Sequence, residues 1–276
     1  MLDRFIYENH LGQRFDSLAN GVFLNYSTLR DYSWSHESIN DRISRFYRPV
    51  INKKMPVVIV GKTEAEAMLA QNTLLDIAEV DIAAVKPGKL YINGYYTHGW
   101  ITGSTKSDYL ISKRYTKNTL TFVSDGSAWY KETTHVFAAG LDAGINNGSG
   151  TDYPYDYQYD YALKASGRII TCDGVGNNAF KLRIYGLATS PAVSVNGHQY
   201  KINGTINPGE SLLIDSVNRT ITLTTASGTP VNWFDKRDRQ MYIFEPIKPG
   251  MNTITWVGTF GFDLMVIEER SEPKWT

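Results

Sequence analysis

Cysteine, net charge and long apolar runs are all scarce in this sequence. Its single cysteine, Cys172, rules out an intrachain disulfide and a zinc cluster built from cysteines. The 28 Lys and Arg residues balance 28 Asp and Glu residues, whereas proteins that bind nucleic acid usually carry a basic excess. No apolar run is longer than four residues, as in Val57–Val60, and a membrane-spanning helix needs about 20. We therefore expect neither nucleic acid nor a membrane as a partner.

The length and composition indicate a folded protein with a substantial core. The chain has 276 residues, of which 42% are hydrophobic, so it can form one large domain or two ordinary ones. Its N-terminus, MLDRFIYENH, lacks the charged and then apolar pattern of a secretory signal peptide. Aromatic residues make up 13% of the chain, which favours β structure and protein interfaces.

Signals for a bound metal or cofactor are weak. The histidines have no H-x-H or H-x-x-x-H spacing; they are His10, His36, His98, His135 and His198. The letters G-x-G-x-x-A occur at residues 174–179, but a dinucleotide loop must lead into a helix, and the next segment reads as a strand. We interpret residues 174–179 as a glycine turn and expect no cofactor and no metal.

One group of carboxylates could be imagined as catalytic. Asp235, Asp238 and Glu245 would provide a pair of acids for cleaving a cell-wall polymer. Three basic residues are interleaved with the two aspartates, however, so a surface loop with salt bridges is the favoured interpretation; they are Lys236, Arg237 and Arg239. No other paired carboxylates, nucleophile motif or phosphate-binding loop is present. We expect that the protein is not an enzyme.

A helix is predicted over residues 63–80. Thr63 and Glu66 form a capping box, and an apolar stripe along Met68, Gln71, Leu75 and Ala78 follows it. This stripe should pack on a sheet.

The central stretch, residues 86–132, reads as a compact β unit. Pro87-Gly88 suits a type II turn, and Asn93-Gly94 is the strongest two-residue hairpin signal. Thr119–Phe122 alternates polar and apolar residues as a half-buried strand does. With the helix, this unit predicts a first domain that is mostly β.

Residues 29–55 interleave aromatic and basic side chains. The functional interpretation is a docking arm that binds another protein surface, and the alternative is an ordinary solvated hairpin. The sequence leaves both open.

The second half of the chain begins after a glycine-rich linker at residues 138–152. A row of alternating tyrosines, Tyr153–Tyr161, follows and could either pack the two domains together or stack on a glycan through Tyr155, Tyr157 and Tyr159. From Gly167 onward, short strands alternate with turns such as Asn196-Gly197. One of these predicted strands is Met241–Phe244. The pattern predicts a β-sandwich.

Several motifs together resemble the distal tail protein of long-tailed, siphovirus-type bacteriophages. The resemblance is carried by KPGKLYINGYY at 86–96, SKRY at 112–115, LTFVSD at 120–125, WYKE at 129–132, YPYDY at 153–157, IKPGMNTITW at 247–256 and PKW at 273–275. It spans most of the chain.

This resemblance implies a mainly β fold with two domains. The first, residues 1–137, would be a ring-forming β-sandwich with one covering helix; the second, residues 153–276, would be a galectin-like β-sandwich whose last residues return to the first domain. In the family an extended hairpin clasps the neighbouring subunit, and residues 29–55 match that arm. At 276 residues the chain has little room for the carbohydrate-binding module that some members insert.

The function implied is that of a non-enzymatic structural hub. The protein would form a hexameric ring in the virion, at the distal end of the phage tail, after synthesis in the cytoplasm of the bacterial host. Its partners would be further copies of itself, the tail tube protein, the tail-associated hub or lysin protein, and receptor-binding or baseplate proteins. Candidate residues for subunit contacts are Tyr32, Trp34, Phe46, Tyr47, Trp100, Trp129 and Tyr130. The alternative function is a glycan-binding sandwich that uses the row Tyr153–Tyr161.

Overall fold

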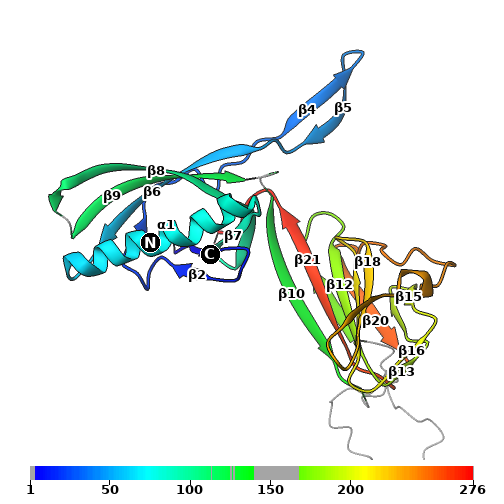
Figure 1. Cartoon of the computed structure of the whole chain (residues 1–276). Coiled ribbons are helices and arrows are strands. Elements are labelled where there is room, and N and C mark those ends of the chain that lie inside the picture. Colours follow the sequence, from blue (N-terminus) through cyan, green and yellow to red (C-terminus); the bar gives the residue numbers. More distant parts are fainter. Residues whose placement is uncertain (1–3, 113, 125, 127, 140–167, 276) are drawn as a thin grey trace, which may run out of the picture. The chain divides into compact units, whose positions relative to one another are not determined.

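The protein is a mainly β structure with two compact units, as predicted (Figure 1). The computed structural model describes residues 4–112, 114–124, 126, 128–139 and 168–275. Unit 1 consists of Met1–Lys131 and Glu269–Thr276, and unit 2 consists of Glu132–Glu268. The sequence had placed the end of the first domain at residue 137 and the start of the second at residue 153. Most of the predicted linker lies outside the described residues.

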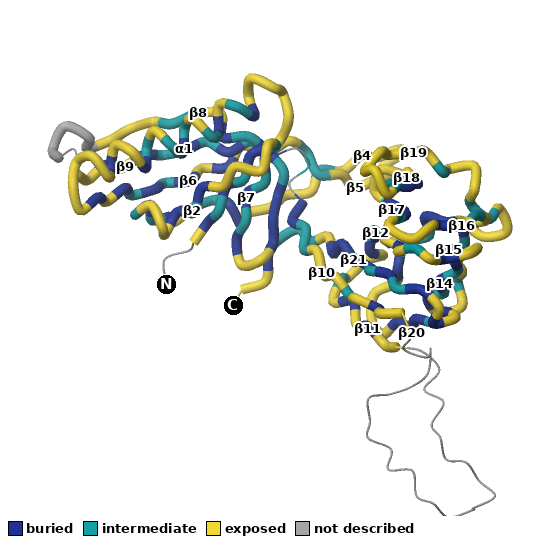
Figure 2. The backbone as a smooth tube through the Cα atoms, turned by 60° about the horizontal axis from the view of Figure 1, so that its bottom comes forward, coloured by how far each residue is buried: buried dark blue, intermediate teal, exposed yellow. Residues whose placement is uncertain are grey.

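Unit 1 is built from antiparallel strands that pair in the order β3-β6-β9-β8-β7-β1-β2. Their bounds are β1 Ile6–Glu8, β2 Arg14–Asp16, β3 Val22–Leu24, β6 Ile51–Val60, β7 Gly88–Ile92, β8 Tyr95–Ser112 and β9 Tyr115–Ser124. The long strand β8 pairs with β7 through its first part and with β9 through its remainder. The alternating burial of β6 and β9 places one side of each strand in a core (Figure 2). Asn93 and Gly94, with φ angles of 50° and 77°, form the predicted hairpin turn between β7 and β8.

The helix α1, Glu64–Ala84, begins as predicted and runs past residue 80. The hydroxyl of Thr63 accepts a hydrogen bond from the backbone N–H of Glu66 at 3.2 Å. The predicted stripe is wrong in part: Met68 is 52% exposed and its neighbour Ala67 is buried instead, whereas Ala78 is buried as predicted. The buried stripe has small residues at most positions; it consists of Ala67, Ala70, Leu74, Ala78 and Asp81. Alanine at three of these positions lets the helix approach the strands closely.

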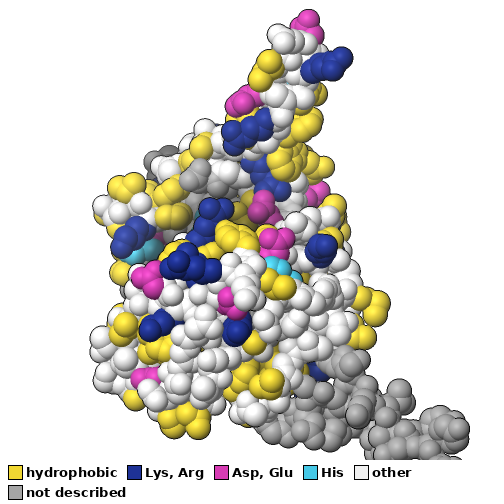
Figure 3. Space-filling model, turned by 90° about the vertical axis from the view of Figure 1, so that its right-hand side faces the viewer, with side chains coloured by type: hydrophobic (Ala, Val, Ile, Leu, Met, Phe, Trp, Pro, Cys, Tyr) yellow, Lys and Arg dark blue, Asp and Glu magenta, His cyan; other side chains and the backbone are white. Residues whose placement is uncertain are grey.

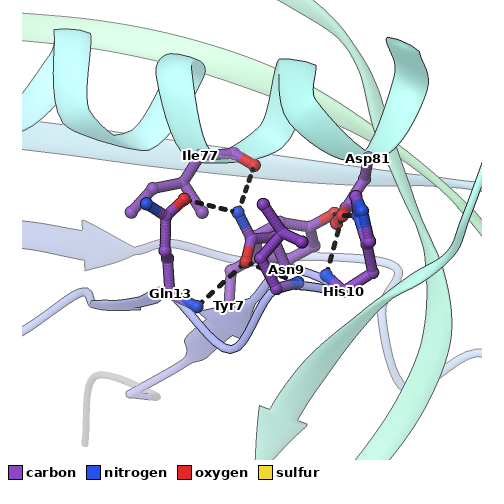
Figure 4. Close-up of polar contacts among 7 residues, drawn as sticks. Tyr7, Asn9, His10, Gln13, Ile77 and Asp81 are labelled. Atoms are coloured by element: carbon purple, nitrogen blue, oxygen red, sulfur yellow. Dashed lines mark hydrogen bonds and ion pairs between the residues drawn. The ribbon is translucent and has the colours of Figure 1, made fainter. Parts of the chain in front are cut away.

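A buried carboxylate joins α1 to the first strand (Figure 4). Asp81 accepts hydrogen bonds from the hydroxyl of Tyr7 at 2.6 Å and from the backbone N–H of His10 at 2.8 Å. Burial, together with this carboxylate, raises the pKa of Tyr7 above its ordinary value. Pro87-Gly88 is not the predicted type II turn, since Gly88 lies in β7 without a positive φ. Glycine is needed there because a Cβ would lie 2.3 Å from an Oδ2 of Asp81.

Unit 2 contains two main antiparallel sheets with a shared apolar core. One sheet has the order β19-β18-β17-β12-β21-β10 and the other has the order β11-β20-β14-β15. Their bounds are β10 Trp129–Phe137, β11 Arg168–Cys172, β12 Ala179–Tyr185, β14 Ala192–Val195, β15 His198–Lys201, β17 Ser211–Asp215, β18 Thr220–Thr224, β19 Pro230–Asn232, β20 Gly250–Trp256 and β21 Phe262–Arg270. The residues of β10 up to Lys131 and those of β21 from Glu269 onward belong to unit 1. A small pair, β13 Ala188–Thr189 and β16 Thr205–Ile206, and the 3₁₀ helix η1, Phe234–Lys236, complete the unit. The rings of Phe137 and Phe262 stack with centroids 4.5 Å apart in this core.

One predicted strand of unit 2 is wrong. Met241–Phe244 has no regular strand structure, and the backbone N–H of Glu245 turns back to the carbonyl of Tyr242 at 3.1 Å. The apolar residues that suggested a strand divide between two environments: Phe244 is 5% exposed and belongs to the core, whereas Tyr242 is 52% exposed. By contrast, strand β12 follows the glycine turn at residues 174–179, so no helix opens there, as expected.

Candidate assembly surface

A two-stranded hairpin of unit 1 is the main candidate for a functional surface. Strands β4, Ser35–Ile39, and β5, Arg42–Tyr47, pair with each other, and among the described strands neither pairs with a third. The connecting residues, Asn40 and Asp41, have φ angles of 49° and 59°, as a type I′ turn requires. Figure 1 shows the hairpin extending away from the other strands of unit 1. Residues 29–55 therefore contain a projecting arm.

The two faces of the hairpin differ in chemistry. The pairs His36–Phe46 and Ser38–Ile43 lie on one face, because directly opposed residues point to the same side and the side alternates along each strand. A β-bulge at Ser44 keeps Ile43 and Phe46 on this same face, which we call the apolar hairpin face and define as His36, Ser38, Ile43 and Phe46. The hydroxyl of Ser44 donates a hydrogen bond to the carbonyl of Glu37 at 3.0 Å at this position.

The opposite face carries most of the charge. It contains Glu37 opposite Arg45 and Ile39 opposite Arg42, with Tyr47 opposite Ser35 near the base. Basic and hydrophobic side chains are both visible along the hairpin in Figure 3. Arginine and aromatic side chains are enriched in protein interfaces, and the arm presents both.

The hairpin exposes apolar side chains that the rest of unit 1 does not cover. Ile43 is 56% exposed and Phe46 is 58% exposed, and every residue of β5 is exposed. A two-stranded hairpin is only marginally stable by itself in water, and its outer edges are open for pairing. These properties suit a segment that docks on another surface. The docking interpretation of residues 29–55 stays a prediction, which these exposed side chains make specific.

The predicted contact residues fall into three environments. Tyr32, Trp34, Phe46 and Tyr47 are exposed, at the base of the hairpin or on it. Trp129 is fully buried in the core of unit 1, so its side chain is not available to a partner. Sequence reasoning missed Ile43, although its position beside a polar two-residue turn in an alternating strand was a usable signal.

The other two predicted residues, Trp100 and Tyr130, are half-buried. Tyr130 of β10 pairs with Tyr96 of β8, and their ring centroids are 5.7 Å apart. His98 lies in the same group, 5.8 Å from the ring of Tyr130. This aromatic cluster holds strands together, which is a structural role sufficient to account for Tyr130.

Among the carboxylates considered for catalysis, Asp238 has a described partner. Asp238 pairs with Lys201 at 3.5 Å, which differs from the interleaved basic residues expected. The backbone N–H of Gln240, followed by Lys201, lowers the pKa of Asp238, whereas a general acid needs a raised one. Arg237 lies over the ring of Phe234 at 4.0 Å.

In the part of the chain that the structure describes, no cluster of three or more His, Cys, Asp or Glu side chains is arranged to hold a metal ion. Across the described residues, no helix combines the length and apolar character needed to span a bilayer. The tyrosine row Tyr153–Tyr161, with Tyr155, Tyr157 and Tyr159, lies outside the described residues.

Over the described residues, the chain is a two-unit, mainly β protein with one α-helix and a projecting hairpin. No protein-family model matches the sequence, and no curated protein matches it. The structure is similar to the Dit protein (gp 19.1) of phage SPP1, described as a paradigm of hub adsorption apparatus in phages that infect Gram-positive hosts. The TM-score is 0.57 with 13% identity, over 98% of this chain and 100% of that one.

Two chains of phage P2 baseplates are also similar. The first comes from the activated baseplate with Ca, with a TM-score of 0.61, 15% identity, and coverage of 99% of this chain and 100% of that chain. The second comes from the activated baseplate with Sr, with a TM-score of 0.60, 14% identity and the same coverage. The resemblance to distal tail proteins that the sequence motifs suggested is confirmed at the level of the fold.

Proposed function

We propose that this protein is a structural, non-enzymatic component of a bacteriophage tail tip, located at the distal end of the tail in the virion. The observation that carries the proposal is the likeness of the fold over nearly the whole chain to phage hub and baseplate proteins. The expected partners are a tail tube protein, a tail-associated hub or lysin protein, and receptor-binding or baseplate proteins. Unit 2 would be the galectin-like sandwich of this assembly.

The assembly that we propose is a closed hexameric ring in which the hairpin of each copy docks on its neighbour. A ring requires a heterologous contact, in which one patch of a subunit meets a different patch of the next. The apolar hairpin face supplies the first patch, since Ile43 and Phe46 are exposed on an arm that projects from its own unit. Burying two such side chains contributes roughly 1.5–3 kcal/mol each.

The test is the native mass of the purified protein, with negative-stain images of the same sample. We expect a ring of six copies of 31.1 kDa, about 187 kDa for the protein alone, or a heavier particle that contains this ring when the tube and hub partners are present. The double variant Ile43→Ser and Phe46→Ser should remain folded and lose the ring. The matched control changes two exposed valines of unit 2, Val175→Ser and Val217→Ser, and should assemble normally.

Two outcomes would contradict the proposal. A wild-type protein that remains a 31.1 kDa monomer, alone and with those partners, is inconsistent with a ring. A ring that forms equally well from the Ile43/Phe46 double variant would show that the hairpin is not the contact, although a ring built through other surfaces would remain.

A further inference from the structure

The C-terminal segment of the chain belongs to unit 1 and contacts the base of the hairpin on both sides, before β4 and after β5. We define the C-terminal clamp as residues Glu269–Trp275, which belong to unit 1. Several partners of the clamp lie more than 200 positions earlier, on the two sides of β4 and β5. A further contact reaches the turn between β7 and β8, where the Nδ2 of Asn93 donates a hydrogen bond to the carbonyl of Lys274 at 3.5 Å. This arrangement cannot be explained by local sequence preferences.

On the incoming side, the clamp contacts Arg30 and Trp34. The guanidinium carbon of Arg30 lies 4.1 Å from the centroid of the Trp275 ring, and its Nη1 donates a hydrogen bond to the carbonyl of Pro273 at 3.4 Å. The Nε1 of Trp34 donates to the hydroxyl of Ser271 at 3.2 Å. Arg30 is buried, which strengthens a cation–π contact because the cation is largely desolvated.

On the outgoing side, after β5, Arg48 contacts both Trp34 and the clamp. Its guanidinium lies 4.4 Å from the ring centroid of Trp34, which connects the two strands that lead into the hairpin. It also forms an ion pair with Glu269, and its Nη2 approaches the hydroxyl of Ser271 at 3.5 Å. The side chain of Arg48 is only 14% exposed, so its charge needs the carboxylate of Glu269 beside it.

We infer that the C-terminal clamp is a positioning element that fixes the direction of the hairpin, with Arg48 and Trp34 as its main contacts. The hairpin strands pair with no third described strand, so their direction is set at the base. An arm held in one direction loses less conformational entropy when it docks than a swinging arm does.

This inference rests on the proposed function for its effect on assembly, but the positioning itself can be measured on the monomer. Spin labels at Arg42→Cys on β5 and Asn72→Cys on α1, in a Cys172→Ala background, report the distance between the arm and the body by electron–electron double resonance. Both labelled positions are exposed. Wild-type protein should give a narrow distribution of distances.

Two clamp variants are compared with a control. One is a chain ending at Arg270. The second, which is the milder change, is Glu269→Gln with Ser271→Ala, and it removes the carboxylate and the hydroxyl that Arg48 and Trp34 contact. Both should broaden the distance distribution and weaken assembly about tenfold or more at each contact. Tyr26→Ala, which removes an aromatic ring of unit 1 that is 84% exposed, should change neither measurement.

The outcomes separate the two ideas. A distribution that stays narrow in the milder variant overturns the clamp, whatever the protein assembles into. If the distance distribution broadens in the clamp variants while assembly is unchanged, the link between clamp and docking is overturned and the tail-tip role is unaffected. If the wild type forms no ring but the distance distribution broadens in the clamp variants, the positioning role is supported and the proposed hexameric ring is contradicted.

Discussion

Lys53 is a buried lysine whose charge should make the stability of unit 1 depend on pH. It lies in β6 with only 1% exposure, and its Nζ donates a hydrogen bond to the carbonyl of Leu29 at 2.7 Å. The ring of Trp129 is 5.6 Å away. Burial lowers the pKa of Lys53 from 10.5 to about 8, and the nearby charges of Asp31 and Glu272 oppose this shift.

The sign and size of the effect follow from proton linkage. Between pH 8 and 10.5 the unfolded chain holds a proton on this lysine that the folded chain has released, so the free energy of unfolding rises with pH in that window. The whole shift corresponds to about 3 kcal/mol, because each pKa unit is worth about 1.4 kcal/mol. Below pH 8 both states hold the proton and the full destabilisation by the buried charge applies.

The comparison is between wild type and Lys53→Leu at pH 7.5 and pH 9.5. The free energy of unfolding of Lys53→Leu minus that of wild type should fall by about 2 kcal/mol from pH 7.5 to pH 9.5, because wild type gains stability as Lys53 loses its charge. Loss of the donor to the Leu29 carbonyl adds a penalty that does not depend on pH, so it cancels. Unfolding in urea is monitored by the oxidation of Met55. Because Met55 is fully buried in the same strand, its oxidation measures the unfolding of unit 1 specifically.

The control is the neighbouring residue. Lys54 is exposed, so Lys54→Leu should differ from wild type by the same amount at both pH values. The reasoning is refuted if the difference in free energy of unfolding between wild type and Lys53→Leu is the same at pH 7.5 and pH 9.5. That result would mean that the folded protein keeps Lys53 charged at no cost.

Three further substitutions test the fold. Val85→Gly should raise the stability of unit 1 by about 1 kcal/mol, because Val85 ends α1 with a φ of 53°, a region that costs a β-branched residue; a loss in urea unfolding would contradict this. Asp81→Ala should lower it by about 3 kcal/mol, since Tyr7 and His10 lose their buried acceptor, and an unchanged urea midpoint would argue against that network. Phe137→Ala should destabilise unit 2 by about 3–5 kcal/mol in the same assay, and a change below 1 kcal/mol would show that its stacking on Phe262 is dispensable.

Features set by neighbouring residues could be predicted from the sequence. The start of α1 at Thr63 depends on a side chain three residues from its partner, and the turn at Asn93-Gly94 depends on two residues that tolerate positive φ. Asn196-Gly197, with φ angles of 50° and 83°, forms a turn of the same kind between β14 and β15. These interactions close over a few residues, so their pattern can be read along the chain.

Properties that depend on distant partners could not be predicted in this way. Gly88 looked like a turn residue, but it is required by the close approach of Tyr7 and Asp81. Trp129 looked like a surface contact, yet the packing of unit 1 buries it completely. Hydrophobicity alone does not determine which apolar side chains are buried in the folded protein.

The candidate site shows the same division. The sequence by itself determined that residues 29–55 carry aromatic and basic side chains around a polar turn, and therefore that an arm was a reasonable hypothesis. Only the tertiary structure decided that a bulge puts Ile43 and Phe46 on one face, and that Arg48 meets a segment at the far end of the chain. The register of a strand pair and contacts across more than 200 residues are decided when the whole chain packs, because no local preference specifies them.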